Sequence, residues 1–414
     1  MSFKPVSEQM ELLTRGVVDL HVKAELEKRL EASRISGKPL RVKAGFDPTR
    51  PDLHVGHAVL LQKMRQFQDL GHTAIFLVGD FTAMVGDPTG HSDARPRLSR
   101  EDVRVAAETY INQASKVLDA APDRLEIRYN TEWLDKLGAG DIVELMAKMT
   151  VSRMLERNDF SKRFTENRPI YQHEFLYPLL QGYDSVALVS DVELGGTDQL
   201  FNLLVGRDLM PKYGHVPQIV MTTPILEGLD AKVDEKGQIV GKKMSKSADN
   251  YIGFHDEPGV MFRKVMQVHD AVIWRYFELL SQKSNEEISA LKQAADPLKA
   301  KRVFARELIA RFHDEAATAT AEVEFDKAYL ADDIPADIKE LEIVTEGATL
   351  WIAKALSAAG LVKSTGEGKR LVEQGGVELD RARVTDGQLQ LERGKRYLLR
   401  VGSKNRRFMY VTVK

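Results

Sequence analysis

Leu40-Arg-Val-Lys-Ala-Gly45 is followed by the turn Asp47-Pro48-Thr49 and then by His54-Val55-Gly56-His57. The first run is short and rich in apolar residues, as strands are, and apolar residues recur at helical spacing from Val55 to Phe67. A second short apolar run, Thr73 to Val78, comes next. This order of strand, helix and strand is the unit from which parallel α/β sheets are built.

The same pattern returns later in the chain. Ser185 to Ser190 is strand-like, Gln199 to Met210 is helical, and Gln218 to Thr222 is strand-like again. Between the two copies lies a stretch of about 100–180 with helical character. We therefore expect an α/β fold in which residues 1–255 form a Rossmann-like parallel-sheet catalytic domain with a helical insertion.

Helices are expected on both sides of this domain. An amphipathic helix is predicted around Ser7 to Ala32, and Val260 to Phe312 has helical periodicity with no strand pattern. The acidic, proline-containing segment Ala331 to Asp337 reads as a linker. Residues 256–335 are thus expected to form an α-helical domain.

A small α+β domain is expected over residues 346–414. Helices are predicted at Thr349 to Gly360 and Lys369 to Glu373, and alternating strands run from Val377 to Val413. From Glu346 to the end there are 14 Lys or Arg and 7 Asp or Glu, although the whole chain has a net charge of −2. This asymmetry indicates a polyanionic partner, and a solvated basic surface is the alternative reading.

The composition limits the chemistry and the compartment. The chain of 414 residues has no cysteine, which excludes disulfides, thiolate metal sites and cysteine nucleophiles. A cytoplasmic location fits this usage best. The start has no apolar signal segment, and the apolar run before Gly79 is too short to span a bilayer, so a membrane protein is not expected.

Two histidines mark the first candidate site. His54-Val55-Gly56-His57 stands where a strand passes into a helix, and the amides and dipole of a helix N-terminus favour phosphate. Gly56 removes a side chain that would keep a nucleotide from the backbone. A partial metal site and plain surface histidines are the alternatives.

A lysine-rich segment is the second candidate. Lys242-Lys243-Met244-Ser245-Lys246-Ser247 lies between the last predicted sheet strand and the helical domain. Flexible ammonium groups can follow phosphate oxygens as negative charge moves to a departing pyrophosphate, which stabilises the transition state. An exposed basic loop without a role in catalysis is the alternative.

A polar stripe marks the third candidate. Tyr177, Gln181 and Asp184 are spaced four and three residues apart, so they share one helical face. The alternative, a solvated helix face, fits poorly because leucines and a phenylalanine crowd around the stripe. We interpret it as the wall of a buried polar pocket.

These segments carry a resemblance to a known family. The histidine and lysine segments, in this order around an α/β core, resemble the signatures of the class I aminoacyl-tRNA synthetases, although nucleotidylyltransferases share the histidine element. Three segments resemble the tyrosyl-tRNA synthetases: Tyr177 to Asp184, Gly79 to Gly90 and Gly195 to Gln199. The resemblance extends over nearly the whole chain. Residues 346–414 are similar to the small RNA-binding module of a ribosomal small-subunit protein.

The resemblance implies roles for individual residues. It implies that tyrosine is bound by Asp87, Tyr177, Gln181, Asp184 and Gln199, with Asp184 at the phenolic hydroxyl. It implies that ATP is bound by Gly45, Asp47, Thr49, His54, Gly56, His57, Gly196, Asp198, Met244, Ser245 and Lys246. Catalysis would rest on His54, His57, Thr49, Lys243 and Lys246.

The sequence also departs from the family pattern. Lys43 stands where many bacterial members have a tyrosine that shares the phenolic hydroxyl, Ala44 replaces a frequent cysteine, and Leu200 replaces a frequent tryptophan. This pattern is similar to that of a second bacterial subfamily. It leaves the second partner of the phenol open.

The resemblance implies activation of tyrosine by ATP through in-line attack of the carboxylate on the α-phosphorus, and then transfer to tRNA(Tyr). ATP would bring Mg²⁺ as part of the substrate, with no protein metal site, no bound organic cofactor and a homodimeric enzyme. Residues 256–335 would help approach the anticodon stem. Two rivals stay open: a tryptophanyl-tRNA synthetase, and a catalytically silent RNA-binding protein on a synthetase scaffold.

Overall fold

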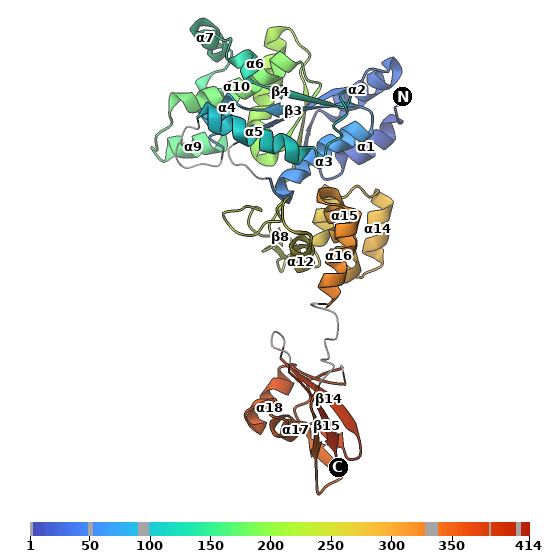
Figure 1. Cartoon of the computed structure of the whole chain (residues 1–414). Helices are drawn as coiled ribbons and strands as arrows, with labels where there is room; N and C mark the ends of the chain where they lie inside the picture. The colour runs from blue at the N-terminus through green and yellow to red at the C-terminus, as the bar shows by residue number, and fades with distance from the viewer. Residues whose placement is uncertain (1–2, 49–52, 90–98, 328–337, 381, 403–406) are drawn as a thin grey trace. The chain divides into compact units, whose positions relative to one another are not determined.

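A computed structural model describes residues 3–48, 53–89, 99–327, 338–380, 382–402 and 407–414. The chain forms two compact units, Met1–Phe325 and Asp326–Lys414 (Figure 1). The expected linker, Ala331 to Asp337, lies outside the described residues.

A six-stranded sheet organises the first unit. The strand order is β1-β6-β5-β2-β3-β4, and every neighbouring pair is parallel except β1 and β6. The strands span Asp19–His21 (β1), Arg41–Phe46 (β2), Thr73–Val78 (β3), Leu125–Tyr129 (β4), Val192–Gly196 (β5) and Ile219–Thr223 (β6). Strand order reverses between β2 and β5, and ligands of open α/β sheets bind beyond the carboxyl ends of the strands at such a point.

Three helices lie beside the point where the strand order reverses. Helix α3, Val55–Asp69, follows β2; α10, Gln172–Leu188, and α11, Leu200–Leu209, make extensive contact with each other. The apolar face of α3 is buried against the sheet, because Val55, Val59 and Phe67 fall at helical spacing. The predicted strands at Leu40 to Gly45 and Thr73 to Val78 are confirmed within one residue at their ends, and the helix between them is confirmed and ends two residues after Phe67.

Three predicted elements are wrong. The predicted helix at Ser7 to Ala32 is two helices, α1 (Val6–Thr14) and α2 (Lys23–Ser36), separated by β1. The predicted strand at Ser185 to Ser190 belongs largely to α10, because a short apolar run does not distinguish a strand from a buried helix end. The insertion is not wholly helical, since it contains β4, an edge strand of the sheet.

The remaining elements of the first unit are helices and short strands. Helix α4 (Thr82–Val85) precedes the insertion, and the insertion contains α5 (Arg100–Ala114), α6 (Thr131–Leu134), α7 (Ala139–Ala147), α8 (Val151–Met154) and α9 (Asn158–Thr165). Those after α11 are η2 (Met210–Tyr213), β7 (Lys232–Val233), β8 (Ile239–Val240), α12 (Pro258–Gln267), α13 (Ile273–Leu280), α14 (Asn285–Gln293), α15 (Pro297–Phe312) and α16 (Glu315–Phe325). A single-turn helix, η1 (Thr197–Gln199), joins β5 to α11.

The helices α12 to α16 share their core with the sheet domain. Phe262, Tyr276, Phe277 and Phe304 are fully buried and belong to the same apolar cluster as the residues that cover the sheet. Burying aromatic side chains of this size contributes strongly to stability. The helical part and the sheet therefore form one compact unit.

The second unit is an α+β domain. Its sheet has the order β12-β11-β14-β15-β9, in which only β15 and β9 are parallel. The elements are β9 (Glu340–Ile343), β10 (Thr349–Trp351), α17 (Ile352–Ala358), α18 (Thr365–Glu373), β11 (Val377–Leu379), β12 (Ala382–Val384), β13 (Gln390–Glu392), β14 (Arg396–Val401) and β15 (Arg407–Val413). The predicted helix at Thr349 to Gly360 is wrong in its first turn, because residues 349–351 pair with β13.

Candidate active site

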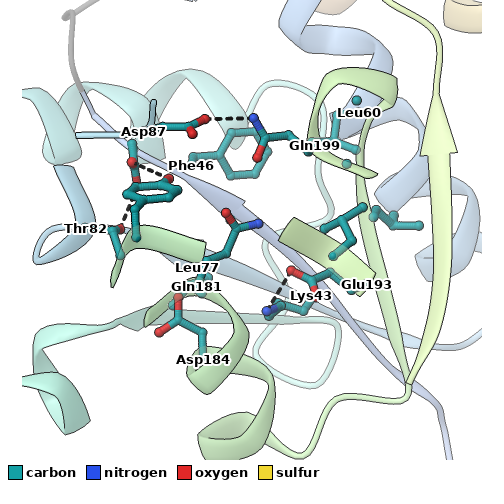
Figure 2. A pocket seen from close by; sticks show the side chains of 18 of the residues that line it. Lys43, Phe46, Leu60, Leu77, Thr82, Asp87, Gln181, Asp184, Glu193 and Gln199 are labelled. Atoms are coloured by element: carbon teal, nitrogen blue, oxygen red, sulfur yellow. Dashed lines mark hydrogen bonds and ion pairs between the residues drawn. The ribbon is translucent and has the colours of Figure 1, made fainter. Parts of the chain in front are cut away.

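A cavity of about 240 Å³ lies at the point where the strand order reverses. Gly45 and Asp47 at the end of β2 line it, together with Gly195 and Gly196 at the end of β5 and with residues of α10. Figure 2 shows Asp87 and Gln199 at one end of this cavity and Asp184, Lys43 and Glu193 at the other, which we call the amine end and the floor.

Asp184 is one of two carboxylates on the floor. It is 2% exposed, and it accepts hydrogen bonds from the indole Nε1 of Trp133 at 2.8 Å and from the Nδ2 of Asn130 at 3.3 Å. Burial raises the pKa of Asp184 to about 7, although the Lys43 ammonium acts in the opposite direction. The two donors fix the direction of a carboxylate that can accept one more hydrogen bond.

Lys43 also belongs to the floor, in a buried ion pair. Its Nζ lies 2.8 Å from the Oε1 of Glu193 and donates to the Oγ of Ser185, also at 2.8 Å. Ser185 donates to Glu193 at 3.0 Å, and the side-chain amide of Gln218 donates to the same carboxylate. Each of these four side chains has at least one partner in the cluster, as buried charges require.

The amine end of the cavity contains several hydrogen-bond acceptors. The Oδ2 of Asp87 accepts a hydrogen bond from the Nε2 of Gln199 at 2.8 Å, and the Tyr177 hydroxyl donates to the Oδ2 of Asp47 at 2.8 Å. Burial and the Asp47 carboxylate raise the pKa of Tyr177. The buried Oε1 of Gln181 has no hydrogen-bond partner among the described residues. This end of the cavity would therefore stabilise a ligand cation with several N–H donors.

A second cavity of about 170 Å³ shares Phe46, His57, Leu60 and Gly196 with the first. Its lining includes His54, which caps the N-terminus of α3. The Nδ1 of His54 accepts from the backbone N–H of Gly56, and the Nδ1 of His57 accepts from the backbone N–H of His54, both at 3.2 Å. A neutral imidazole that accepts at Nδ1 carries its proton at Nε2.

The two imidazoles are neutral at physiological pH. Burial, with His57 and the segment's lysines, lowers the pKa of His54 to about 3. Burial and Lys243 lower the pKa of His57 to about 4. The site therefore offers two Nε2–H donors beside a helix N-terminus, which suits an anionic ligand.

The lysine segment is anchored beside the second cavity. Met244 is 1% exposed, and its N–H donates to the carbonyl of Leu226 at 2.9 Å. The Oδ1 of Asn250 accepts from the N–H of Ser245 at 2.8 Å. In contrast, the Nζ of Lys243 is largely exposed and lies 3.6 Å from the Oδ2 of Asp198.

Most of the predicted site residues come together. Those lining the first cavity are Gly45, Asp47, His57, Asp87, Tyr177, Gln181, Asp184, Gly196 and Gln199. Those lining the second are His54, Gly56, His57, Gly196, Asp198, Lys243 and Met244. Ser245 and Lys246 line neither cavity, and Thr49 lies outside the described residues.

Several side chains that shape the site carry no signal in the sequence. Trp133 and Asn130 reach Asp184 from the insertion, and the Thr82 hydroxyl donates to the Oδ1 of Asp47 at 2.7 Å. Gly79 allows this last contact, because a Cβ there would lie 2.0 Å from that oxygen. Each partner is distant in sequence from the group it contacts.

Comparison with known proteins shows the family of the chain. The family described as tRNA synthetases class I (W and Y) matches residues 36–329. The tyrosine–tRNA ligase of Geobacter sulfurreducens is 49% identical over 412 residues, which cover 98% of this chain and 99% of that protein. The chain belongs to the tyrosine–tRNA ligases. The ligase of Bordetella avium is 50% identical over 407 residues, covering 96% of this chain and 95% of its own.

Solved structures show the same ligase fold. One is the C-terminally truncated mitochondrial tyrosyl-tRNA synthetase of Coccidioides posadasii. The match covers 78% of this chain and 92% of that chain, with a TM-score of 0.61 and 21% identity. The tyrosyl-tRNA synthetase of Archaeoglobus fulgidus, complexed with L-tyrosine, matches 76% of this chain and 99% of its own, with a TM-score of 0.60 and 22% identity. The S4 domain family matches residues 350–396, in the second unit. Among the described residues, every helix is too short or too polar to cross a membrane.

Proposed function

We propose that this ligase activates L-tyrosine with ATP and transfers it to tRNA(Tyr), and that the first cavity binds the tyrosine. The phenolic hydroxyl donates to Asp184 on the floor, and the ammonium group is held by Asp87, Gln181 and Tyr177 at the amine end. Gln199 lies near the carboxylate. The observation that carries this assignment is the paired carboxylate floor opposite an acceptor-rich end.

The second cavity is proposed to bind ATP. The neutral imidazoles of His54 and His57 donate through Nε2 to the phosphates, while Gly196 and Asp198 lie at the ribose. Gly45, Asp47 and Thr49 are proposed to contact the phosphates, and Mg²⁺ arrives on ATP as part of the substrate. The shared lining of the two cavities supports this arrangement, because the reacting groups must meet.

The reaction needs no side-chain base. The tyrosine carboxylate is ionised, attacks the α-phosphorus and displaces pyrophosphate. Negative charge then grows on the leaving group, where Lys243 and Lys246 meet it, and the preorganised donors of His54 and His57 stabilise the same charge. The terminal ribose hydroxyl of tRNA then takes the tyrosyl group from the adenylate.

The S4 domain supports the tRNA role. Lysine and arginine contacts to phosphates would give this unit affinity that falls with salt and carries no base specificity. Residues 256–335 are proposed to approach the anticodon stem. The cytoplasm is the compartment we propose.

We also propose a homodimer, formed through the insertion. The insertion carries several large exposed apolar side chains, among them those of Val143, Met146, Val151, Phe164 and Tyr171. Exposed apolar side chains that form one patch are typical of interaction surfaces, and we propose that these side chains form such a patch. Sedimentation tests this proposal, since a chain that sediments at its monomer mass of 46.5 kDa at micromolar concentration contradicts it.

Exchange of labelled pyrophosphate into ATP, followed by transfer to tRNA, tests the function. We expect exchange with tyrosine and none of comparable rate with phenylalanine or tryptophan. Exchange led by tryptophan would favour a tryptophanyl enzyme. RNA binding without exchange by any of the three would favour the silent scaffold.

A further inference from the structure

Arg157 is a buried arginine outside the cavity. It immediately precedes α9 in the insertion, its side chain is 5% exposed, and it does not contribute to the lining of either cavity. Its guanidinium Cζ lies 4.9 Å from the centre of the Phe160 ring, which covers it. A buried cation of this kind is costly unless every N–H is used.

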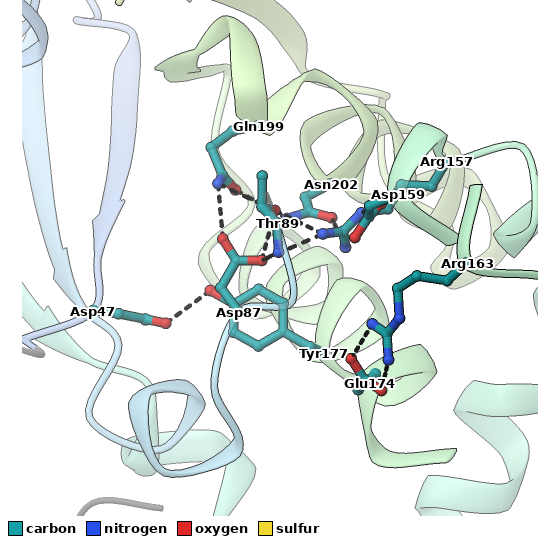
Figure 3. A network of polar contacts seen from close by, with 10 residues as sticks. All are labelled: Asp47, Asp87, Thr89, Arg157, Asp159, Arg163, Glu174, Tyr177, Gln199 and Asn202. Atoms are coloured by element: carbon teal, nitrogen blue, oxygen red, sulfur yellow. Dashed lines mark hydrogen bonds and ion pairs between the residues drawn. The ribbon is translucent and has the colours of Figure 1, made fainter. Parts of the chain in front are cut away.

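Two chains of hydrogen bonds, or routes, connect the guanidinium to the amine end of the cavity (Figure 3). On the first, its Nη1 donates to the Oδ1 of Asn202 at 3.2 Å, and the Nδ2 of Asn202 donates to the Oε1 of Gln199 at 2.9 Å. Gln199 then donates to Asp87 at 2.8 Å. In this chain of hydrogen bonds each side-chain amide accepts on its oxygen and donates from its nitrogen. The hydrogen bond from Arg157 therefore fixes the orientation of the Asn202 amide, which in turn fixes that of the Gln199 amide.

The second route runs through Thr89. The Nη2 of Arg157 donates to the Thr89 Oγ1 at 2.7 Å, and that hydroxyl donates its only proton to the Oδ1 of Asp87 at 2.6 Å. The backbone N–H of Thr89 donates to the same oxygen at 2.9 Å, and Nη2 itself lies 3.6 Å from it. Both oxygens of Asp87 are therefore held by groups that Arg157 orients.

Asp159 completes the environment of the cation. Its Oδ1 lies 2.8 Å from the Nε of Arg157, and this contact occupies the remaining edge of the guanidinium. Arg157 thus brings together three segments that are distant in sequence: the insertion, the loop at 87–89 and helix α11.

We propose that Arg157 is a positioning residue, which acts through Thr89 and through Asn202 and Gln199 to fix Asp87 in the orientation that binds the ammonium group of tyrosine. This inference rests on the proposed function, because it assumes that the tyrosine ammonium lies at Asp87. Arg157 does not touch the substrate. It acts through Thr89 and Asn202, so its loss removes the selectivity for the amine while the phenol site at Asp184 stays intact.

The test compares two ligands in the full chain. One is L-tyrosine and the other is 3-(4-hydroxyphenyl)propionate, which has the same phenol and carboxylate and lacks the amine. Dissociation constants are measured by calorimetry for the unaltered chain, Arg157→Gln and Arg157→Lys. We expect Arg157→Gln to weaken tyrosine binding about tenfold or more, as expected for hydrogen bonds to a charged group, with little change for the amine-free acid.

Arg157→Lys keeps the positive charge and loses the planar guanidinium, which donates in several directions at once. We therefore expect this variant to bind tyrosine more tightly than Arg157→Gln and less tightly than the unaltered chain. Arg163→Lys is the matched control, since Arg163 is equally buried in the insertion and pairs with Glu174 instead. Equal weakening of both ligands by Arg157→Gln would overturn the proposal, as would unchanged binding of both. If Arg157→Gln does not fold, Thr89→Val removes one route and must show the same selective loss.

Asp87→Asn separates this proposal from the proposed function. If Asp87→Asn leaves the preference for tyrosine over the amine-free acid unchanged, the ammonium site itself is wrongly placed. If that preference is lost in Asp87→Asn and kept in Arg157→Gln and Thr89→Val, the ammonium site stands and the role of Arg157 is refuted.

Discussion

The floor of the first cavity and the lysine segment beside the second differ in how they hold charge. On the floor, Lys43 is fully buried and bonded to Glu193 and Ser185. Beside the second cavity, the Lys243 side chain is 61% exposed and lies 3.6 Å from its carboxylate partner. Fixed, desolvated groups suit the selection of one substrate, whereas solvated lysines can follow charge as it moves to a leaving group.

The largest expected effect of this difference is on stability. Lys43→Met leaves the Glu193 carboxylate buried without its cation, and breaking a buried pair in this way costs about 3–5 kcal/mol of unfolding free energy. Lys243→Met, in an exposed pair, should cost less than about 1 kcal/mol. Urea denaturation of the two variants measures both values, and equal losses would remove the distinction.

Substitutions in the lysine segment should lower the rate of tyrosine activation rather than the stability of the fold. Lys243→Ala and Lys246→Ala remove charges that we propose meet the departing pyrophosphate, so we expect the rate of tyrosine activation to fall about a hundredfold while the dissociation constant of tyrosine stays constant. Single-turnover formation of the adenylate separates the two quantities. Lys242→Ala is the control in the same segment, and a rate loss as large in that variant would argue for a nonspecific charge effect.

The two cavities should also respond differently to pH. The pKa of Asp184 is raised to about 7, whereas the pKa values of His54 and His57 lie at about 3 and 4. A carboxyl group with a raised pKa in the folded chain stabilises the fold at low pH, and this contribution is lost as pH rises from about 4 to about 7.

Asp184→Asn isolates that contribution. Relative to the unaltered chain, the variant should gain unfolding free energy as pH rises from about 4 to about 7, by an amount on the order of 3 kcal/mol. The buried histidines titrate in both proteins, so their opposite contribution cancels in the difference. Denaturation at pH 4.5, 6 and 7.5, three points spanning about that range, measures it; a constant difference would contradict the raised pKa.

The smallest effect is expected at Gly56. A Cβ there would lie 2.9 Å from the ring of His54, so Gly56→Ala forces the imidazole to move. We expect the KM for ATP to rise about threefold to tenfold, in line with the modest cost of local overpacking, while tyrosine binding is unchanged. Gly140→Ala, where a Cβ meets nothing within 4 Å, is the control. A matching change in tyrosine affinity would show that the two cavities are coupled.

The parts of the fold that could be predicted from the sequence have strong local periodicity. Helix α3 and strands β2 and β3 are of this kind. Strand β4 was missed because Leu125–Tyr129 alternates charged and apolar residues at a partly exposed sheet edge within a long helical stretch. Strand β1 has only three residues and is stabilised by pairing with β6, about 200 residues away.

The candidate site shows the same division. Tyr177, Gln181 and Asp184 could be grouped because one helix carries them, and the histidines because they stand at a helix N-terminus. Arg157 lies among charged neighbours in the sequence and resembles a surface residue there. Its burial follows from tertiary packing against Phe160, Thr89 and Asn202, for which local sequence holds no signal.

The central claim is that Asp184 selects tyrosine by accepting its phenolic hydrogen bond. The most direct test is the ratio of kcat/KM for tyrosine to that for phenylalanine in pyrophosphate exchange, before and after Asp184→Ala. We predict that the ratio falls by about tenfold to a hundredfold, because the hydroxyl loses its charged acceptor. An unchanged ratio in a folded variant would contradict the account and place the selection of the phenol elsewhere in the cavity.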